Sequence, residues 1–388
     1  MLQAGMTASL PVRSIVEAQD MPRLLSFELA GRLAEGMAGV AWAPENDASG
    51  GAPPGRLGGP KAEAWPYDIA ATPSVNVPAL CVVGETWWFP RFGGLIGTDG
   101  ALYNATVGEA RHGSGDLSAI PGLSDQATRF TPPASAPMLD GGAVFLPWGA
   151  TFNYGHFVID ALPSLMGLEQ IGLLETLPIL APKLAAWQRD LIALAFPDRA
   201  VTEIDAPVVR LKRTAFATSM DHFLHHPNGL LADLAARVLA RAPAGAGHRR
   251  VYLSRRGQSM RVMVGEAAFE KALAARGFAI VRPETLDAVE QVALMRDAEV
   301  VVGASGAALA NAVFLSRGAR VVEIQPLNFT SQWVRAACRQ VGVDWRGYVC
   351  ASPCPAREAP LTARLRRGFK FAFKPPLDDL LRFVDAAL

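Results

Sequence analysis

Cysteine and long apolar runs are both scarce in this sequence of 388 residues. The four cysteines are too few for a disulfide framework. Only Cys350 and Cys354 lie close together, with no histidine at zinc-finger spacing, so we expect free thiols. The longest apolar run, residues 300–315, is interrupted by glycine, serine and asparagine and is shorter than the ~20 residues that cross a bilayer. The amino terminus also lacks the apolar core of a signal peptide. We therefore expect a cytoplasmic protein without a transmembrane segment, held at most peripherally at the inner face of the membrane.

Neither sign of charge is in excess. Lysine and arginine number 37, against 36 aspartates and glutamates, which gives a net charge of +1. This balance excludes bulk electrostatic capture of nucleic acid or of an anionic membrane, so no nucleic-acid partner is expected, although a local basic pocket remains compatible with it. Half of the residues are hydrophobic, which is enough for a sizeable core. The length predicts two or three domains at about 150 residues per domain.

The first 150 residues read as an irregular, β-rich segment. The stretch 45–66 is rich in glycine and proline and predicts neither a helix nor a central strand. Candidate strands separated by glycine-containing turns follow at Ala79–Val83, Thr86–Phe89 and Ala143–Leu146. Apolar residues at helical spacing then predict a helix over 156–174, with a kink at Pro163.

Regular alternation begins after a linker at 241–247. Strands are predicted at 250–254, 278–282, 299–302 and 320–324, and helices at 266–276, 287–297, 306–315 and 331–341. This alternation predicts βαβ units and a parallel sheet covered on both faces, an α/β fold. A last helix, 377–388, carries an apolar stripe, and we expect it to pack back on the amino-terminal half of the chain.

A small-residue turn between a buried strand and a helix is the most informative segment. Backbone N–H groups at Ser305, Gly306 and Ala307 would face a phosphate without competing side chains. Glu323, twenty positions after Gly303, is predicted to accept hydrogen bonds from ribose hydroxyls. The turn alone is equally compatible with close packing of helix against strand, and Glu323 favours nucleotide binding.

Basic residues follow the first strand of this alternating region. Arg255 and Arg256 come directly after Ser254, and Arg261 follows shortly. Guanidinium groups at the carboxyl edge of a sheet form a fork-shaped site for a diphosphate. The alternative is a solvated surface charge run.

A third cluster combines His156 with Asp160. On a helix these residues share one face, where a carboxylate orients an imidazole and raises its basicity, as a general base requires. The preceding Asn153 could equally serve only as a helix cap. A fourth cluster, 221–226, contains three histidines, but it lacks the glutamate of a His-Glu-x-x-His metal site. We predict no metal site there, and His225 is left as an acceptor-side candidate.

Together these segments resemble glycosyltransferase family 61. Residues 153–163 read NYGHFVIDALP, similar to the family's N-Y-G-H-W-x-x-D-x-L-P helix. Ser254–Arg256 and Arg261–Glu266 resemble the family's S-R-R strand end and the R-x-x-x-N-E segment that follows it. Glu290-Gln291 matches its acidic-Gln helix. Gly303–Asn311 resembles its G-x-H-G-A-G-L-A-N turn, and Val321–Pro326 its V-x-E-I-x-P strand. The resemblance covers roughly residues 145–348. The sequence departs from the family pattern at Gly265, Ser305 and Ala308.

The resemblance implies a GT-B-like architecture, in which two Rossmann-like domains face a cleft. Residues 1–242 would be the acceptor-side domain, with 1–150 β-rich, and 248–375 the nucleotide-sugar-binding domain. It also implies inverting transfer from a nucleotide sugar, taken here as UDP-linked, to a glycan or lipid-linked acceptor, without a bound metal. The implied donor site comprises Arg255, Arg256, Arg261, Ser305, Gly306, Ala307, Asn311 and Glu323. His156 with Asp160 would act as base, with Asn153, Tyr154 and His225 on the acceptor side or structural.

Two other interpretations remain open. Gly303, Gly306 and Glu323 would also suit a nicotinamide-dependent oxidoreductase of Rossmann type, although such a turn normally follows the first strand of its unit. The departures at Gly265, Ser305 and Ala308 would also fit a non-catalytic nucleotide-sugar-binding protein on the same scaffold.

Overall fold

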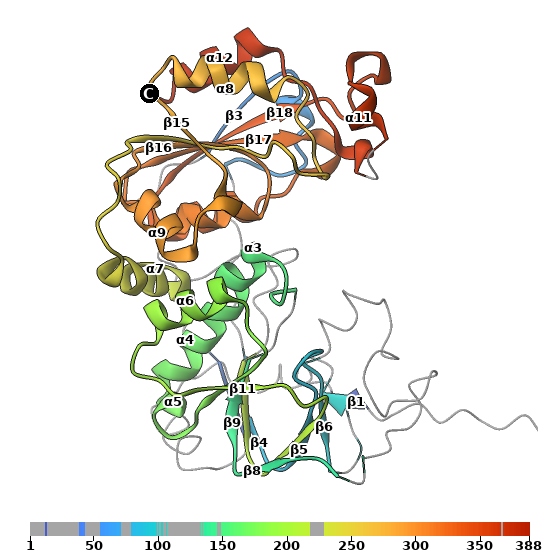
Figure 1. Ribbon diagram of the computed structural model, residues 1–388, viewed down its shortest axis with the longest axis vertical. Coiled ribbons are helices and arrows are strands. Elements are labelled where there is room, and N and C mark those ends of the chain that lie inside the picture. Colours follow the sequence, from blue (N-terminus) through green and yellow to red (C-terminus); the bar gives the residue numbers. More distant parts are fainter. Residues whose placement is uncertain are drawn as a thin grey trace, which may run out of the picture. The chain divides into compact units, whose positions relative to one another are not determined.

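The computed structural model describes residues 12–13, 39–42, 55–70, 79–98, 100, 102–103, 106, 133, 135–145, 149–217, 229–365 and 368–388. The chain forms two compact units (Figure 1). Unit 1 comprises Met1–Glu45, Val77–Ile192 and Phe196–Asp221, and unit 2 comprises Asn46–Asn76, Ala193–Ala195 and His222–Leu388. None of the described helices is long and apolar enough to cross a membrane. All four cysteines are buried free thiols.

Unit 1 contains a largely parallel sheet of six strands in the order β11-β10-β9-β13-β4-β2. Its strands are β2 (Gly39–Trp42), β4 (Ala79–Val83), β9 (Gly142–Val144), β10 (Ile179–Pro182), β11 (Val201–Ile204) and β13 (Thr214–Ala217). Strands β11, β10, β9 and β13 are mutually parallel, and the order reverses between β9 and β13. In open α/β sheets such a reversal opens a ligand crevice at the carboxyl ends of the strands.

A second sheet makes the amino-terminal part β-rich, as predicted. Its order is β1-β7-β6-β5-β12-β8, with β1 (Val12–Arg13), β5 (Thr86–Trp88), β6 (Leu95–Gly97), β7 (Leu102–Tyr103), β8 (Met138–Leu139) and β12 (Val209–Leu211). The two sheets share one apolar core, in which Trp88 and Leu95 meet Val144, Leu180 and Phe216.

The helical region of unit 1 begins two residues before the predicted start. It runs through α3 (Tyr154–His156), a π-helical turn (Phe157–Ala161), α4 (Leu162–Gln170) and α5 (Leu173–Thr176), and α6 (Ala186–Ala195) follows β10. Pro163 stands in the first turn of α4, where its missing N–H costs no hydrogen bond. The irregularity expected at Pro163 therefore lies one turn earlier, as the π-helical turn.

Unit 2 is built on an all-parallel sheet in the order β15-β14-β16-β17-β18-β3. The strands are β14 (Arg250–Leu253), β15 (Ala279–Val281), β16 (Val300–Ala304), β17 (Arg320–Pro326), β18 (Asp344–Cys350) and β3 (Arg56–Gly58). Helices α7 (Gly229–Arg241), α8 (Glu266–Ala274), α9 (Ala288–Asp297), α10 (Trp333–Val341), α11 (Leu361–Arg364) and α12 (Leu377–Asp385) surround it. The predicted parallel α/β fold is confirmed, with α8 and α12 on one face and α9 on the other (Figure 1).

Two segments assigned to the amino-terminal domain belong to unit 2 instead. Strand β3 extends the sheet beside β18, and the Arg335 guanidinium donates hydrogen bonds to the carbonyls of Asp68 (3.1 Å) and Ile69 (2.6 Å). Helix α7 also lies in unit 2, although the predicted boundary followed it. A short strand within this Pro/Gly-rich stretch is tolerated because β3 is an edge strand, where few ladder bonds are required.

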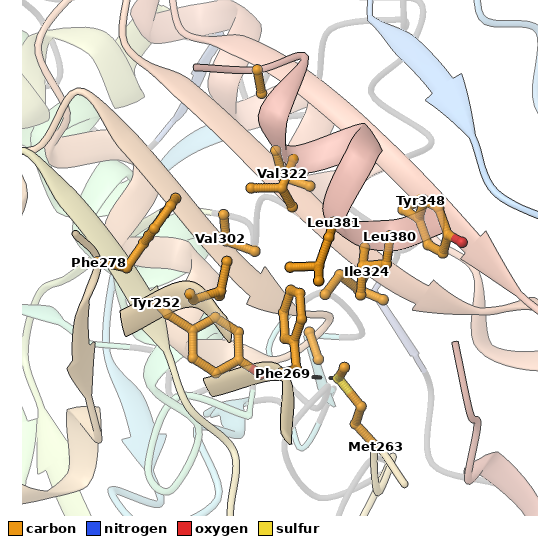
Figure 2. Packing of buried hydrophobic residues seen from close by; sticks show 14 of the residues in the cluster. Tyr252, Met263, Phe269, Phe278, Val302, Val322, Ile324, Tyr348, Leu380 and Leu381 are labelled. Carbon is orange, nitrogen blue, oxygen red and sulfur yellow. Dashed lines mark hydrogen bonds between the residues drawn. The ribbon is translucent and has the colours of Figure 1, made fainter. Parts of the chain in front are cut away.

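Helix α12 packs on the sheet of unit 2, so its expected docking on the amino-terminal half was wrong. Leu380 and Leu381 are buried with Val302 and Ile324 of the central strands and with Phe269 of α8 (Figure 2). An ion pair between Arg276 and Asp385 ties α12 to the chain just after α8. The apolar stripe of an amphipathic helix requires an apolar partner. Helix α12 finds this partner on the face of the unit 2 sheet that α8 also covers.

Candidate active site

The carboxyl ends of β14 and β16 bring two predicted segments together. Counting along unit 2, the strands β15, β14, β16, β17 and β18 follow the doubly wound order 2-1-3-4-5, which reverses between β14 and β16. Leu253 is paired with Gly303, so Arg255 and Ser305 leave the sheet side by side. Ligands of such sheets bind at this reversal, outside the carboxyl edge.

Arg255 lies directly against the turn. A Cβ on Gly306 would overlap its guanidinium group, so the close approach requires glycine at this position. Arg255 donates from Nη2 to the carbonyl oxygen of Met260 at 3.1 Å, while its buried Nε makes no hydrogen bond within the described part of the chain. Burial lowers the pKa of Arg255, because desolvation disfavours the charged form.

Arg261 approaches the same turn from the loop that follows Arg255. Its Nε donates to the carbonyl oxygen of Ser305 at 2.8 Å, and its guanidinium lies over the Phe329 ring at 4.6 Å. Its backbone has φ +52°, a left-handed conformation that a residue with a Cβ rarely adopts. Burial and then the charge of Arg255 lower its pKa to about 10.

The two guanidinium groups therefore form a pair of neighbouring, partly buried cations. Neither makes a salt bridge to any carboxylate that the structure describes. Like charges that share a desolvated site repel, and an anion placed between them would relieve both costs. The arrangement fits a ligand with phosphate oxygens.

Two glutamates of helix α8 accept hydrogen bonds from residues at the carboxyl end of β14. Glu266 Oε1 accepts hydrogen bonds from the Tyr252 hydroxyl (2.8 Å) and from the backbone N–H of Arg255 (2.7 Å). Burial raises the pKa of Glu266 despite these bonds. Glu270 accepts from the Ser254 hydroxyl at 2.6 Å and pairs with Arg256 at 2.8 Å. Arg256 is thus engaged with α8, and no contact of its side chain with the turn is found among the described residues.

The helix after the turn differs from the prediction. Residues Ala307–Phe314 form a 3-10 helix, not an α-helix, and it follows an extended Gly306. Small side chains at every third position allow this tighter winding, in which residues i and i+3 eclipse. The first N–H groups of any helix still lack partners within it, so Ala307 remains a candidate donor to a phosphate. Ser305 is almost fully buried, and its backbone N–H is bonded to Ile324 at 2.9 Å.

Glu323 does not stand at the end of its strand as expected. Strand β17 continues to Pro326 because β18 pairs with it as far as Cys350. Glu323 is 0% exposed and accepts a hydrogen bond from the Trp345 indole at 2.9 Å. Burial raises its pKa to about 7. A carboxyl group enclosed in this way does not reach a ribose, so the predicted ribose contact was wrong.

Asn311 is also enclosed. It is fully buried in the 3-10 helix, and its side-chain amide donates to the side-chain Oε1 of Gln291 in α9 at 2.8 Å. Gln291 in turn donates to the carbonyl oxygen of Pro283 at 3.1 Å. We therefore assign Asn311 to the support of the turn and not to ligand contact.

In unit 1, His156 and Asp160 meet as their spacing predicts. Nδ1 of His156 lies 2.7 Å from Oδ2 of Asp160, and both side chains are buried. They follow the carboxyl end of β9, at the reversal of the strand order. The carboxylate fixes the ring orientation and favours a proton on Nδ1, which leaves Nε2 as the basic nitrogen. A Cβ on Gly149 would come within 2.8 Å of the imidazole, so the loop packs closely on the ring.

The neighbouring candidates have structural contacts. Asn153 caps α3 by accepting from the N–H groups of Gly155 (2.9 Å) and His156 (3.4 Å). The ring of Tyr154 lies 5.4 Å from that of Trp187 on α6. Phe152, which no sequence pattern indicated, is 65% exposed beside this helix start.

His225 lies outside the described residues, as does the rest of the segment 221–226. This segment follows β13 in the chain. Among the residues that the structure describes, no group of three or more histidine, cysteine or acidic side chains is arranged to hold a metal ion.

Sequence reasoning missed Glu270 and Phe329. Glu270 is four residues after Glu266 and thus on the same helix face, a signal that the i,i+4 rule makes available. Phe329 stacks against the Arg261 guanidinium from the short 3-10 helix Leu327–Phe329 after β17, and nothing in its local sequence marks it.

The parallel sheets of both units, with a cation-lined turn at a strand-order reversal, place the protein among the Rossmann-like α/β proteins. Within that class, the family model described as Glycosyltransferase 61 matches residues 154–322, so the chain carries a glycosyltransferase 61 domain and is an enzyme of glycosyl transfer. The match includes His156, Arg255 and Gly306, and it ends one residue before Glu323. The resemblance drawn from the sequence is thereby confirmed. No curated protein matches the chain.

Proposed function

We propose that this protein is an inverting glycosyltransferase that uses a nucleoside diphosphate sugar, specifically a UDP-sugar, as its donor. The observation that carries the proposal is the pair of guanidinium groups, Arg255 and Arg261, at the turn around Gly306. They lie at the strand-order reversal of unit 2, and among the described residues neither guanidinium makes a salt bridge to a carboxylate. A pyrophosphate would satisfy both cations and would also meet the first N–H groups of the 3-10 helix.

The same cations serve the chemical step. When the bond between the anomeric carbon and the donor oxygen breaks, the electron pair leaves with the diphosphate. Fixed positive charge at that oxygen stabilises the leaving group as it forms, and desolvation strengthens the effect. Arg256 pairs with Glu270 at 2.8 Å, so it is given no direct contact with the diphosphate in this proposal.

His156 is the proposed general base. As the acceptor oxygen bonds to the anomeric carbon on the face opposite the leaving group, its proton passes to Nε2 of His156. Asp160 stabilises the resulting imidazolium at 2.7 Å. Inversion at the anomeric carbon follows from one displacement of this kind. The proposal includes a GT-B-like arrangement, in which the two units present these groups to a common cleft.

One exposed aromatic ring next to a pair of half-buried rings supports a carbohydrate acceptor. Phe152 is 65% exposed, and it lies two residues before Tyr154, whose ring packs on Trp187. Apolar ring faces beside a proposed base would bind the apolar face of a sugar ring, and the hydroxyl groups would then be fixed by polar contacts. The proposed acceptor is a glycan or a lipid-linked sugar.

Isothermal titration of UDP tests the donor site. We expect Arg255→Gln and Arg261→Gln each to weaken UDP binding about 10–100-fold, the range that one charge-assisted hydrogen bond represents. Arg249→Gln is the matched control, because Arg249 is exposed and stands at the amino edge of the same sheet. Unchanged UDP affinity in both site variants would refute the donor assignment.

Two companion measurements address the alternatives. Titration of NAD in place of UDP tests the oxidoreductase interpretation. That interpretation used Glu323 as the acid that binds a ribose, and Glu323 is buried. Hydrolysis of UDP-sugars with and without added acceptor separates an enzyme from a binding protein. Activity that persists in EDTA would bear out the predicted metal independence.

A further inference from the structure

The segment from Pro355 to Lys374, here called the α11 segment, exposes two leucines. Leu361 is 59% and Leu365 is 76% exposed. The backbone N–H of Leu365 bonds to the carbonyl of Leu361 at 3.0 Å, so both side chains share one face of the turn. Ala363 is buried on the inner side. Two large apolar side chains held together in water indicate a surface that is covered by something else.

Exposed cations precede and follow these leucines in the segment. Arg357, Arg364 and Lys370 are exposed, and Lys374 pairs with Glu358, the only carboxylate among the described residues of the segment. Four cations and one carboxylate give these residues a net charge of +3, in a chain whose total net charge is +1. The positive charge is thus concentrated where the leucines are exposed.

The α11 segment is packed against and hydrogen-bonded to the rest of unit 2. Cys354, Ala359 and Ala372 form a small core, against which Phe369 and Val264 pack. Backbone hydrogen bonds join the segment to the loop that follows β14, from Val264 N–H to Phe373 O (2.8 Å) and from Phe373 N–H to Val262 O (3.0 Å). Helix α11 lies at the periphery of unit 2, apart from α8 and α12 (Figure 1).

We propose that the α11 segment docks the protein peripherally on an anionic lipid bilayer. Leu361 and Leu365 enter the interface between headgroups and acyl chains, and Arg357, Arg364 and Lys370 contact lipid phosphates. Apolar side chains flanked by cations are the side-chain pattern of interfacial membrane binding. An acidic polysaccharide would use the cations, but it would leave both leucines in water.

The docking surface is joined to the proposed donor site. Asn328 donates from its side-chain amide to the Lys370 carbonyl oxygen at 2.6 Å. The Phe371 ring packs edge-on against Phe329 at 5.0 Å, and Phe329 lies under Arg261. These contacts connect the α11 segment to Arg261, whose Nε donates to the carbonyl oxygen of Ser305 in the turn. The membrane proposal itself stands on the leucines and cations and does not depend on the identity of the donor.

Vesicle co-sedimentation of the full chain tests the proposal. Vesicles of phosphatidylcholine alone are compared with vesicles that also contain about 30% phosphatidylglycerol, at about 0.1 M and about 0.5 M salt. We expect binding only to the anionic vesicles, weakened at the higher salt because the cations are screened. Leu361→Ser with Leu365→Ser should weaken it on the order of 100-fold, and Arg364→Gln about fivefold.

The control combines Leu388→Ser with Arg249→Gln. Both residues are exposed, and both lie at the amino edge of the sheet, since the Leu388 carbonyl bonds to Arg320 at the start of β17. This variant should bind anionic vesicles like the unaltered chain. The proposal is overturned if the unaltered chain stays in solution with both vesicles, or if the α11 variants match the control. Retention on an anionic polysaccharide column without vesicle binding overturns it in favour of an acidic glycan. Circular dichroism confirms that each variant is folded.

Discussion

Replacing Glu323 by glutamine removes a carboxyl group from the middle of β17. The side chain is 0% exposed, and burial raises its pKa from the ordinary 4.5 to about 7. Ser305, Gln325 and the Arg261 charge lower the pKa but do not offset burial. The folded protein therefore holds this proton at pH values where the unfolded chain has released it.

The sign of the pH dependence follows directly. Below about pH 4.5 the group is neutral in both states and has no effect on stability. Between pH 4.5 and about 7 the unfolded chain is ionised while the folded one is protonated, so the free energy of unfolding falls as pH rises. The full loss is about 3 kcal/mol and is reached above about pH 7, because one pKa unit is worth 1.36 kcal/mol.

Glu323→Gln should abolish this loss. The amide oxygen can still accept from the Trp345 indole, so the variant is expected to be more stable than the unaltered chain by about 3 kcal/mol near pH 8 and equal to it near pH 4.5. Urea unfolding at a series of pH values measures the difference, and hydrogen exchange in β17 peptides identifies the transition of unit 2. Taking the difference between the two proteins cancels the other titrating groups.

The exposed Glu299 provides a matched control. Glu299→Gln lies just before β16 on the same sheet, and we expect its stability difference from the unaltered chain to stay within about 0.5 kcal/mol over the same range. A Glu323→Gln difference that does not vary with pH would show that this carboxyl is ionised in the folded state and would refute the reasoning.

Three further predictions concern the turn, the base and the core. Gly306→Ala should displace the Arg255 guanidinium and weaken UDP binding about 10–100-fold in calorimetry, with little loss of stability. Gly84→Ala, at a glycine with open space around it, should do neither, and equal effects of the two would contradict this account. His156→Ala should lower kcat about 10²–10⁴-fold while the donor affinity stays constant, and a raised donor Kd instead would remove His156 from the role of base. Leu380→Ala should lower the free energy of unfolding by about 3 kcal/mol in urea titrations, and a loss below about 1 kcal/mol would contradict the packing of α12 in this core.

Local patterns predicted most of the elements and the meeting of the key side chains. Strand β4 has the predicted bounds, and α9 begins one residue after the predicted start, with Asp287 and Glu290 forming a capping box there. The i,i+4 spacing placed His156 against Asp160, and the strand ends placed Arg255 at Gly306. These predictions were correct because each depends on a single local feature, either the period of a helix or the order of neighbouring strands, that can be inferred directly from the sequence.

The failures concern properties that depend on distant partners. The enclosure of Glu323 follows from the length of β18 and from Trp345, which lies on that neighbouring strand. An apolar stripe on α12 predicts burial without saying against which sheet. The assignment of β3 to unit 2 depends on pairing with β18, 290 positions later in the chain, a contact that no local pattern predicts.

The insertion of residues 46–76 into unit 2 has a practical meaning for dissecting this enzyme. The chain leaves unit 1, contributes β3 and the carbonyl groups that hold Arg335, and then returns before β4. A shortened protein that begins at His222 would therefore lack one strand and would uncover the edge of β18 together with the Trp345 ring, which Trp65 covers at 5.8 Å. An uncovered strand edge invites aggregation. Independent folding of the carboxyl-terminal half should require residues 46–76 to be supplied, either fused by a circular permutation or co-expressed as a separate peptide.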